Sequence, residues 1–317
     1  MRQTASPTVL FTDEIDDTHL AELREVAPRA RLWRCADATE ISARIGEADV
    51  VAGFVDRAAL ARAGRLAWVH SWAAGPNRQL YPEFVAHGAM LTSSKGNGAI
   101  PLAEHAMMLM LMLNRGALRW LDGQRERRWA PFLHGELTGL TAGLLGVGHA
   151  GTELARRCRA FGMEVIGLRR SGRPAEGVGR LYPQAQLHDF LAASDFVVVT
   201  APLTPETQSM LGEAEFRAMK PSAHYICVSR GGIAEDAVLL RALREGWIAG
   251  AGLDAHGTEP LPPDSPFWSL PNTIVTPHNG ATTALTRMRG REIFRDNLAR
   301  FVSGGPLFNL VDTRAGY

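Results

Sequence analysis

The chain has 317 residues, 46% hydrophobic and 21% charged, which is typical of a folded globular protein and long enough for two domains. Its 34 basic and 33 acidic residues leave a formal net charge of +1, which excludes a net field that would draw the chain to nucleic acid or an anionic membrane. The cysteines Cys35, Cys158 and Cys227 are odd in number and far apart, which excludes a disulfide framework, shows no metal-ligand spacing and fits a reducing cytoplasm.

The N-terminal segment MRQTASPTVLF contains one short apolar run before Asp13 and Glu14. That run is too short for the apolar core of a signal peptide, so we expect the mature chain to begin near Met1. The most apolar stretch, Ala106 to Leu113, is far shorter than the roughly 20 residues that cross a membrane. It therefore predicts a buried helix face, and we expect no membrane association.

Short β-rich runs alternate with helical stretches in the first third of the chain. This alternation predicts a parallel sheet with crossover helices. The predicted strands are 9–11, 50–54, 68–70 and 89–92, and 18–26 is a representative helix.

A helix with Pro101 in its first turn is expected to run to about Trp120 and to mark a domain boundary. A second alternating series follows, and a closing helix over 284–302 could return to the first unit. We therefore expect a discontinuous first domain of residues 1–100 and 285–317, and a second domain of residues 101–284. The strands predicted in the second domain are 142–146, 164–168, 196–200, 224–229, 248–255 and 273–277.

The motif Gly146-Val-Gly148-His149-Ala150-Gly151 directly follows the first of these strands and precedes a helix expected over 152–161. Strand before and helix after is the arrangement that aims backbone N–H groups at a pyrophosphate. Gly146 would allow the turn, Gly148 the approach of the phosphates and Gly151 the packing of the helix on the sheet. The motif predicts dinucleotide binding. A second glycine pair, Gly250 and Gly252, is not followed by a predicted helix. We interpret these two glycines as small residues in a packed strand.

The next strand ends about 20 residues past the glycine loop, where enzymes that use NAD usually hold an acidic residue on the ribose. Here stand Arg169, Arg170 and Ser171, followed by Arg173. One interpretation is a solvated arginine cluster. The other is a clamp for the 2′-phosphate of NADP, which predicts a preference for NADPH, with NADH possible.

Three polar residues follow the ends of three successive predicted strands: Arg230, Glu259 and His278. In an open α/β sheet, ligands bind at the carboxyl ends of the strands, so we expect these side chains to converge. Arginine can polarise a carbonyl group and histidine can donate a proton near neutral pH. A carboxylate beside the histidine would favour its protonated form and fix its orientation.

The segment from VSRGG to TPHNG, together with GLLGVGHAG, APLTPET and TSSKGNGAIPLAEH, closely resembles the NAD(P)-dependent D-2-hydroxyacid dehydrogenase family. The resemblance covers nearly the whole chain and implies that Arg230, Glu259 and His278 are catalytic. It further implies a Rossmann-type cofactor domain and a flavodoxin-like substrate domain around a cleft, commonly paired as a homodimer. The implied cofactor contacts, beyond the glycine loop and the arginines, are Thr200, Pro202, Val228, Arg230, Asp254, His278 and Gly280.

The chain departs from the family pattern in places. The family's carboxylate-binding loop corresponds to Ala73-Ala74-Gly75-Pro76-Asn77, so substrate binding by the amides of Ala74 and Gly75 is implied, while Pro76 and Asn77 differ. His256 stands where an aromatic residue is frequent, and Cys227 where asparagine is. Trp72 and Lys95 lie in loops that could face the substrate or could simply be packed or solvated.

The sequence thus predicts reduction of a small 2-oxo acid, such as glyoxylate or hydroxypyruvate, to its D-2-hydroxy acid, without a metal. One rival is a dehydrogenase of another small anion, such as formate or phosphite, although formate enzymes usually have glutamine where Glu259 stands. Another is a dinucleotide-sensing protein resembling the C-terminal-binding corepressors.

Overall fold

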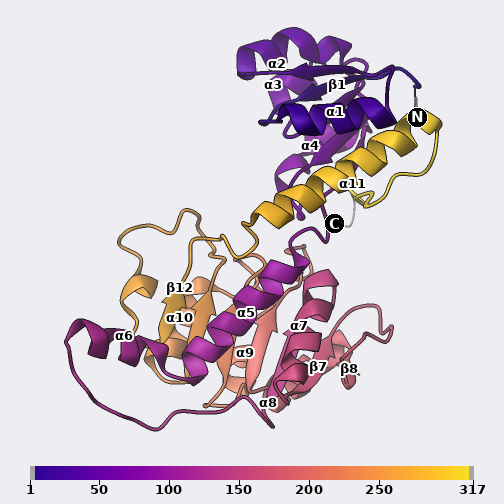
Figure 1. The fold of residues 1–317 in the computed structure, drawn as a ribbon. Helices are drawn as coiled ribbons and strands as arrows, with labels where there is room; N and C mark the ends of the chain where they lie inside the picture. Colours follow the sequence, from indigo (N-terminus) through magenta and orange to yellow (C-terminus); the bar gives the residue numbers. More distant parts are fainter. Residues whose placement is uncertain (1–3, 314–317) are drawn as a thin grey trace. The chain divides into compact units, whose positions relative to one another are not determined.

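The computed structural model describes residues 4–313 (Figure 1). The chain forms two compact units. The first extends to Asn97 and resumes at Thr283, and the second is Gly98–Thr282.

The first unit contains five parallel strands in the order β2-β1-β3-β4-β5, the order of a flavodoxin-like sheet. The strands are β1 (Thr8–Phe11), β2 (Arg31–Arg34), β3 (Val50–Ala52), β4 (Trp68–Ser71) and β5 (Met90–Ser93). The helices are α1 (Asp17–Val26), α2 (Ala38–Arg44), α3 (Arg57–Leu60), α4 (Pro82–His87) and α11 (Ala284–Ser303), with 3₁₀ turns at Ile45–Glu47 and Asn77–Gln79.

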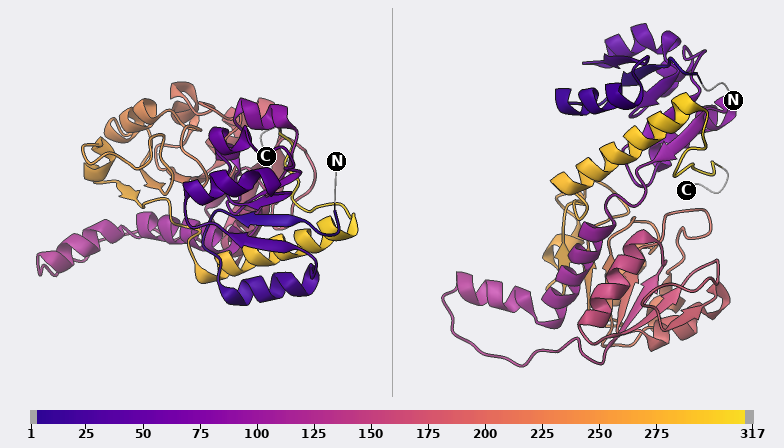
Figure 2. Two further views of the ribbon diagram at one scale, coloured as in Figure 1. Left: turned by 90° about the horizontal axis from the view of Figure 1, so that it is seen from above. Right: turned by 45° about the vertical axis from the view of Figure 1, so that its right-hand side comes forward.

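Helices cover both faces of this sheet. Successive residues of a strand point to opposite faces, so neighbouring residues of one strand pack against different helices. Val9 and Phe11 of β1 pack with α1 and α11, whereas Leu10 packs with the cluster that includes α3 and α4. Helices α1 and α11 lie side by side on one face, although they come from opposite ends of the chain (Figures 1 and 2).

The second unit contains seven parallel strands in the order β12-β11-β10-β9-β6-β7-β8. The order reverses between β6 and β9, which is the topological switch point of a Rossmann-type sheet. The strands are β6 (Thr141–Leu145), β7 (Glu164–Leu168), β8 (Arg180–Tyr182), β9 (Phe196–Val199), β10 (His224–Cys227), β11 (Gly250–Leu253) and β12 (Thr273–Val275).

Helices cover both faces of this sheet as well. Residues of α5 and α7 share one core cluster, and residues of α8, α9 and α10 share the other. The helices are α5 (Ala99–Asn114), α6 (Ala117–Arg125), α7 (His149–Ala160), α8 (Leu187–Ala193), α9 (Glu213–Ala218) and α10 (Asp236–Arg244), with 3₁₀ turns at Gln184–Gln186 and Pro266–Ser269. The predicted fold class of two parallel-sheet α/β units is confirmed.

The prediction of one long helix from Pro101 to about Trp120 is wrong. Helix α5 ends at Asn114, and Gly116 adopts a left-handed conformation with φ of 64° before α6 begins. Glycine tolerates that conformation without a Cβ penalty, so the chain turns there. Helix α7 also begins earlier than expected, at His149, within the glycine motif.

The apolar stretch of α5 presents a buried face as predicted, while Met108 on the same stretch is 39% exposed. Leu109 and Met110 are fully buried, and a Cβ on Gly252 of β11 would lie 3.0 Å from the Cβ of Leu109. The small residues of β11 therefore allow α5 to pack closely on the sheet, as predicted for Gly250 and Gly252. In the described part of the chain, no helix combines the length and the apolar character that crossing a bilayer requires.

Candidate active site

Arg230, Glu259 and His278 follow β10, β11 and β12, three neighbouring strands of the second sheet. His278 Nδ1 lies 2.8 Å from both carboxylate oxygens of Glu259. Their side chains are 33% and 36% exposed, respectively, so the pair is reachable from solvent. Because a carboxylate can only accept, Nδ1 carries the donated proton and Nε2 is the nitrogen directed away from Glu259.

The Glu259 carboxylate is held from a second side. Its Oε1 accepts the backbone N–H of His256 at 2.9 Å. Partial burial acts to raise the pKa of Glu259, but this hydrogen bond and the contact with His278 outweigh it, so the pKa is lowered. Glu259 is therefore an anion at neutral pH, ready to stabilise a protonated imidazole.

Arg230 is half-buried, and burial lowers its pKa while the charge of Glu259 acts in the opposite direction. Its Nη1 donates to the Ser229 carbonyl at 2.7 Å, which fixes the guanidinium at the end of β10. The Cys227 thiol donates to the Arg230 carbonyl at 3.3 Å. The influence of the Glu259 charge on Arg230 agrees with the expected convergence of the predicted side chains.

Asp254, which is fully buried, fixes the loop that carries His278. It accepts the N–H groups of Asn279 and Gly280 at 3.1 and 3.0 Å and the hydroxyl of Thr276 at 2.6 Å. His278 has a φ of 50°, an uncommon conformation for a residue with a Cβ. Asp254 thus holds both sides of the histidine in place.

The sequence reasoning missed several polar residues around this loop. His105 of α5 lies 3.0 Å from the Thr276 hydroxyl and 3.5 Å from Asp254 Oδ1 through its Nε2. The Ser229 hydroxyl is buried without a hydrogen-bond partner among residues 4–313. The sequence signal that could have found Ser229 and Thr276 was their position, since Ser229 directly precedes Arg230 and Thr276 lies two positions before His278.

The glycine loop follows β6, beside the switch point. Gly146 has a φ of 94°, and a Cβ there would lie 2.6 Å from backbone atoms of Ala201. A Cβ on Gly151 would lie 2.7 Å from the Gly146 carbonyl oxygen. These contacts confirm the predicted turn at Gly146 and the close helix packing at Gly151.

The residues around the loop fit a dinucleotide. A Cβ on Gly148 would meet open space, and Gly148 begins α7 without a side-chain cap, which leaves backbone N–H groups facing outward at the positive end of the helix. The Thr200 hydroxyl donates to the Gly146 carbonyl at 2.5 Å, so the ends of β6 and β9 are joined. The unpaired Ser229 hydroxyl is a further polar group that a bound molecule could satisfy.

Other residues implied to contact the cofactor lie along the same edge of the sheet. The Pro202 carbonyl accepts from Thr207 at 2.8 Å, Val228 is buried after β10, and a Cβ on Gly280 would lie 2.8 Å from Asp254 Oδ2. His149 and Ala150 form the first turn of α7. Order along the edge thus runs from the glycine loop to Thr200, then Arg230, Glu259 and His278.

Arg169, Arg170 and Ser171 follow β7, the strand next to β6 on the other side of the switch point. Arg170 and Ser171 are exposed, and Arg169 is half-buried. Arg169 Nη1 donates to the Arg173 carbonyl at 3.2 Å. The group therefore forms a compact basic turn beside the glycine loop.

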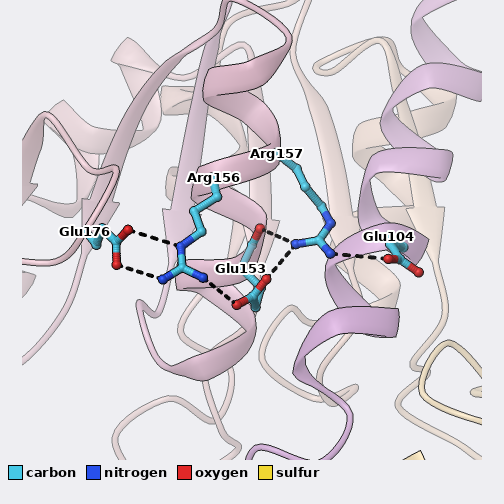
Figure 3. A network of polar contacts seen from close by, with 5 residues as sticks. All are labelled: Glu104, Glu153, Arg156, Arg157 and Glu176. Atoms are coloured by element: carbon cyan, nitrogen blue, oxygen red, sulfur yellow. Dashed lines mark hydrogen bonds and ion pairs between the residues drawn. The ribbon is translucent and has the colours of Figure 1, made fainter. Parts of the chain in front are cut away.

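A chain of ion pairs holds α7 to its neighbours (Figure 3). Glu153 pairs with Arg156 at 2.9 Å and with Arg157 at 2.7 Å. Arg156 reaches Glu176 at 2.8 Å, and Arg157 reaches Glu104 of α5 at 3.2 Å. The network ties α7, whose first turn belongs to the glycine motif, to α5 and to the segment that follows the basic turn.

Ala74 and Gly75 lie in the first unit, in the loop after β4. Ala74 is exposed, and neither backbone N–H donates to an acceptor within residues 4–313. Trp72 packs edge-on against His70 and Phe294 at centroid distances of 5.1 and 5.3 Å, so packing accounts for it. The Lys95 carbonyl accepts from Asn309 Nδ2 at 2.9 Å.

Comparisons with known proteins identify relatives of the chain. Residues 107–280 match the family described as D-isomer specific 2-hydroxyacid dehydrogenase, NAD binding domain. The chain is 32% identical to a glyoxylate reductase of Korarchaeum cryptofilum over 322 aligned residues, covering 96% of each protein.

Solved structures match over the full length. A D-isomer specific 2-hydroxyacid dehydrogenase family protein of Aeromonas salmonicida has a TM-score of 0.88 at 32% identity, covering 97% of this chain and 99% of that one. An NADPH-dependent glyoxylate/hydroxypyruvate reductase of Sinorhizobium meliloti, solved with NADP and sulfate, has a TM-score of 0.86 at 30% identity, covering 98% and 100%. Because the family model matches more than half of the chain and relatives match nearly all of it, the protein belongs to the D-isomer specific 2-hydroxyacid dehydrogenase family.

Proposed function

We propose that this enzyme reduces a small 2-oxo acid, such as glyoxylate or hydroxypyruvate, to the D-2-hydroxy acid with NADPH. The observation that supports this most strongly is the Glu259–His278 pair at 2.8 Å, next to Arg230 at the carboxyl edge of a Rossmann-type sheet. A proton donor and a cation near one another are what carbonyl reduction by hydride requires.

His278 would act as the general acid. Glu259 holds Nδ1, so Nε2 is the nitrogen that would donate a proton to the carbonyl oxygen of the substrate. The carboxylate of Glu259 favours the protonated imidazole before transfer. When the product forms, His278 is left neutral and takes a proton from solvent before the next turnover.

Arg230 would bind and polarise the substrate. One of its N–H groups is used by the Ser229 carbonyl, and the rest of the guanidinium fork suits a carboxylate and an adjacent carbonyl oxygen. The N–H groups of Ala74 and Gly75, in the first unit, are proposed as further donors to the substrate carboxylate. This assigns the first unit to substrate binding and residues 101–284 to the cofactor.

The cofactor would be held at the glycine loop and along the sheet edge, by Gly146, Gly148, His149, Ala150, Gly151, Thr200, Pro202, Val228, Asp254 and Gly280. Bound NADPH supplies a hydride from the nicotinamide ring. Arg169, Arg170 and Ser171 are proposed to bind the 2′-phosphate, because a basic turn at the end of β7 lies where this phosphate is read in Rossmann folds. The similarity to the NADPH-dependent reductase of Sinorhizobium meliloti supports this preference.

We also propose a homodimer in the cytoplasm. Helix α6 and the following segment expose large apolar side chains: Trp129 is 97% and Leu133 100% exposed. Such a surface suits burial against a second copy of the chain. Sedimentation velocity should give about twice the 34.4 kDa chain mass, whereas a monomer would contradict the proposal. The free cysteines agree with a reducing compartment.

The direct test of the function is a panel of glyoxylate, hydroxypyruvate, phenylpyruvate, formate and phosphite, with NADPH oxidation or NADP reduction followed by absorbance. We expect turnover with at least one 2-oxo acid and none with formate or phosphite. If no 2-oxo acid reacts while NADPH still binds, the proposed reductase activity is wrong, and a dinucleotide-sensing binding protein becomes the favoured hypothesis.

A further inference from the structure

Buried polar side chains outside the three catalytic residues include His256, which follows β11 and is 8% exposed. We infer that His256 is a positioning residue for the reaction, because its imidazole joins the loop that carries Glu259 to the loop that carries His278. The inference rests on the proposed function and deepens it.

His256 contacts both loops. Its backbone N–H donates to Glu259 Oε1 at 2.9 Å, and its Nε2 lies 3.1 Å from the carbonyl oxygen of Thr276. A carbonyl can only accept, so Nε2 carries the proton of this bond. Thr276 lies two residues before His278, and the bond therefore links the two members of the catalytic pair through a second route.

The imidazole completes a set of bonds along one segment. The Asp254 carboxylate accepts hydrogen bonds from the Thr276 hydroxyl and from the N–H groups of Asn279 and Gly280. The backbone just before His278 is held at the N–H of Thr276, which donates to the Leu253 carbonyl at 2.9 Å, and at the carbonyl of Thr276, which accepts from His256. This backbone is in the left-handed region at His278, a conformation that persists only when its surroundings hold it.

The position of the His256 backbone itself does not depend on its side chain. A Cβ on Gly231 would fall within van der Waals overlap of the His256 carbonyl, so the loop after β10 packs directly against it. Gly257 is in turn fitted closely to Asp236, since a Cβ there would lie 2.5 Å from Asp236 Oδ2. A substitution at 256 should thus remove the imidazole bond and leave the amide that holds Glu259 in place.

The matched variants are His256→Gln and His256→Asn. The glutamine amide nitrogen can reach the place of Nε2, whereas asparagine is one methylene too short. His256→Phe keeps the ring without the donor. Misplacing a reacting group by about 1 Å can lower a rate about 100-fold, so we expect a roughly 10- to 100-fold lower kcat in the Asn and Phe variants. The KM for NADPH should stay unchanged, and His256→Gln should recover most of the kcat.

A second readout does not need turnover. In ¹⁵N-histidine NMR, the His278 ring, assigned by comparison with His278→Ala, should show the Nδ1-protonated tautomer in the wild type and in His256→Gln. A mixture of tautomers is expected in the Asn and Phe variants. Thermal unfolding identifies any variant that fails to fold. The comparison of His256→Gln with whichever of the Asn and Phe variants folds then tests the inference.

The inference is overturned if Asn and Phe variants keep the wild-type kcat and tautomer, or if Gln does no better than Asn. Failure of the proposed function looks different: the wild type turns over no 2-oxo acid, and the His278 tautomers of the variants still decide whether His256 positions the ring.

Discussion

The chemistry at the residue scale depends on charge next to His278. Glu259 has a lowered pKa because the hydrogen bonds it accepts outweigh partial burial, and so it is ionised across the neutral range. Its distance of 2.8 Å from Nδ1 places a full negative charge against the imidazole. Such a partner favours the protonated form, which is the form that reduction consumes.

Removing that charge should therefore move the pH profile. In the Glu259→Gln variant, the protonated imidazole loses its partner, so reductase activity should be lost at lower pH than in the wild type. The measurement is kcat against pH for 2-oxo acid reduction. Asp264→Asn, which changes an exposed carboxylate in the same loop, is the control. An unshifted profile in Glu259→Gln would rule out this role for Glu259.

How much of the site the sequence predicts depends on how its residues are recognised. Arg230, Glu259 and His278 each follow a strand within a motif, so the sheet topology alone brings them to one edge. His105 and the imidazole of His256 act through hydrogen bonds to groups distant in sequence, and the buried Ser229 hydroxyl has no hydrogen-bond partner among residues 4–313. No spacing rule predicts such contacts, because they depend on how the loops turn after the strands end.

At the scale of elements, apolar strands were predicted well and polar edges poorly. Strands β6, β7 and β9 are long apolar runs, and the structure places them within one or two residues of the prediction. Strands β2 and β8 lie at sheet edges and read Arg-Leu-Trp-Arg and Arg-Leu-Tyr, so solvent-facing arginines hide the strand pattern. Gly116 is a sequence signal for the end of α5, but the apolar periodicity on both sides of it favoured one continuous helix.

The element that should decide cofactor choice is the basic turn after β7. Each charge-assisted hydrogen bond contributes about 1.5–3 kcal/mol, so a clamp of one or two should favour NADPH over NADH by roughly 10- to 10,000-fold. Arg169→Ala and Arg170→Ala should lower kcat/KM for NADPH and leave the value for NADH nearly unchanged. Arg159→Ala, which removes an exposed arginine of α7, serves as the control.

Equal kcat/KM values for the two cofactors in the wild type would contradict the assignment. A parallel loss with both cofactors in the Arg169 and Arg170 variants would also contradict it, because it would show that these arginines support the fold of the domain and not the 2′-phosphate.

For the whole molecule, each unit buries a histidine in its neutral form. His70 lies between the hydroxyls of Thr92 and Ser94 in the first unit, and burial lowers its pKa to about 3. His224 of the second unit stacks on Phe196, and burial lowers its pKa to about 4. Neither belongs to the proposed catalytic set, so both are expected to matter for stability.

The sign of the effect follows from proton linkage. Below the ordinary histidine pKa of 6.5, the unfolded chain binds a proton at His70 that the folded chain does not bind until about pH 3. The free energy of unfolding should thus fall as pH is lowered through this window, by up to about 1.4 kcal/mol per pH unit for this group. In His70→Asn, urea unfolding between pH 7 and pH 5 should depend less on pH. An identical dependence in wild type and variant would contradict the burial of a neutral His70.

The central claim is that His278 transfers the proton in a hydride reduction. The measurement is kcat for 2-oxo acid reduction, paired with the Kd of NADPH from fluorescence, in wild type and His278→Ala. Loss of a positioned general acid typically lowers a rate about 100- to 10,000-fold, so we predict a loss of that order in kcat with an unchanged Kd. Retained kcat, or an equal weakening of kcat and NADPH binding, would contradict it.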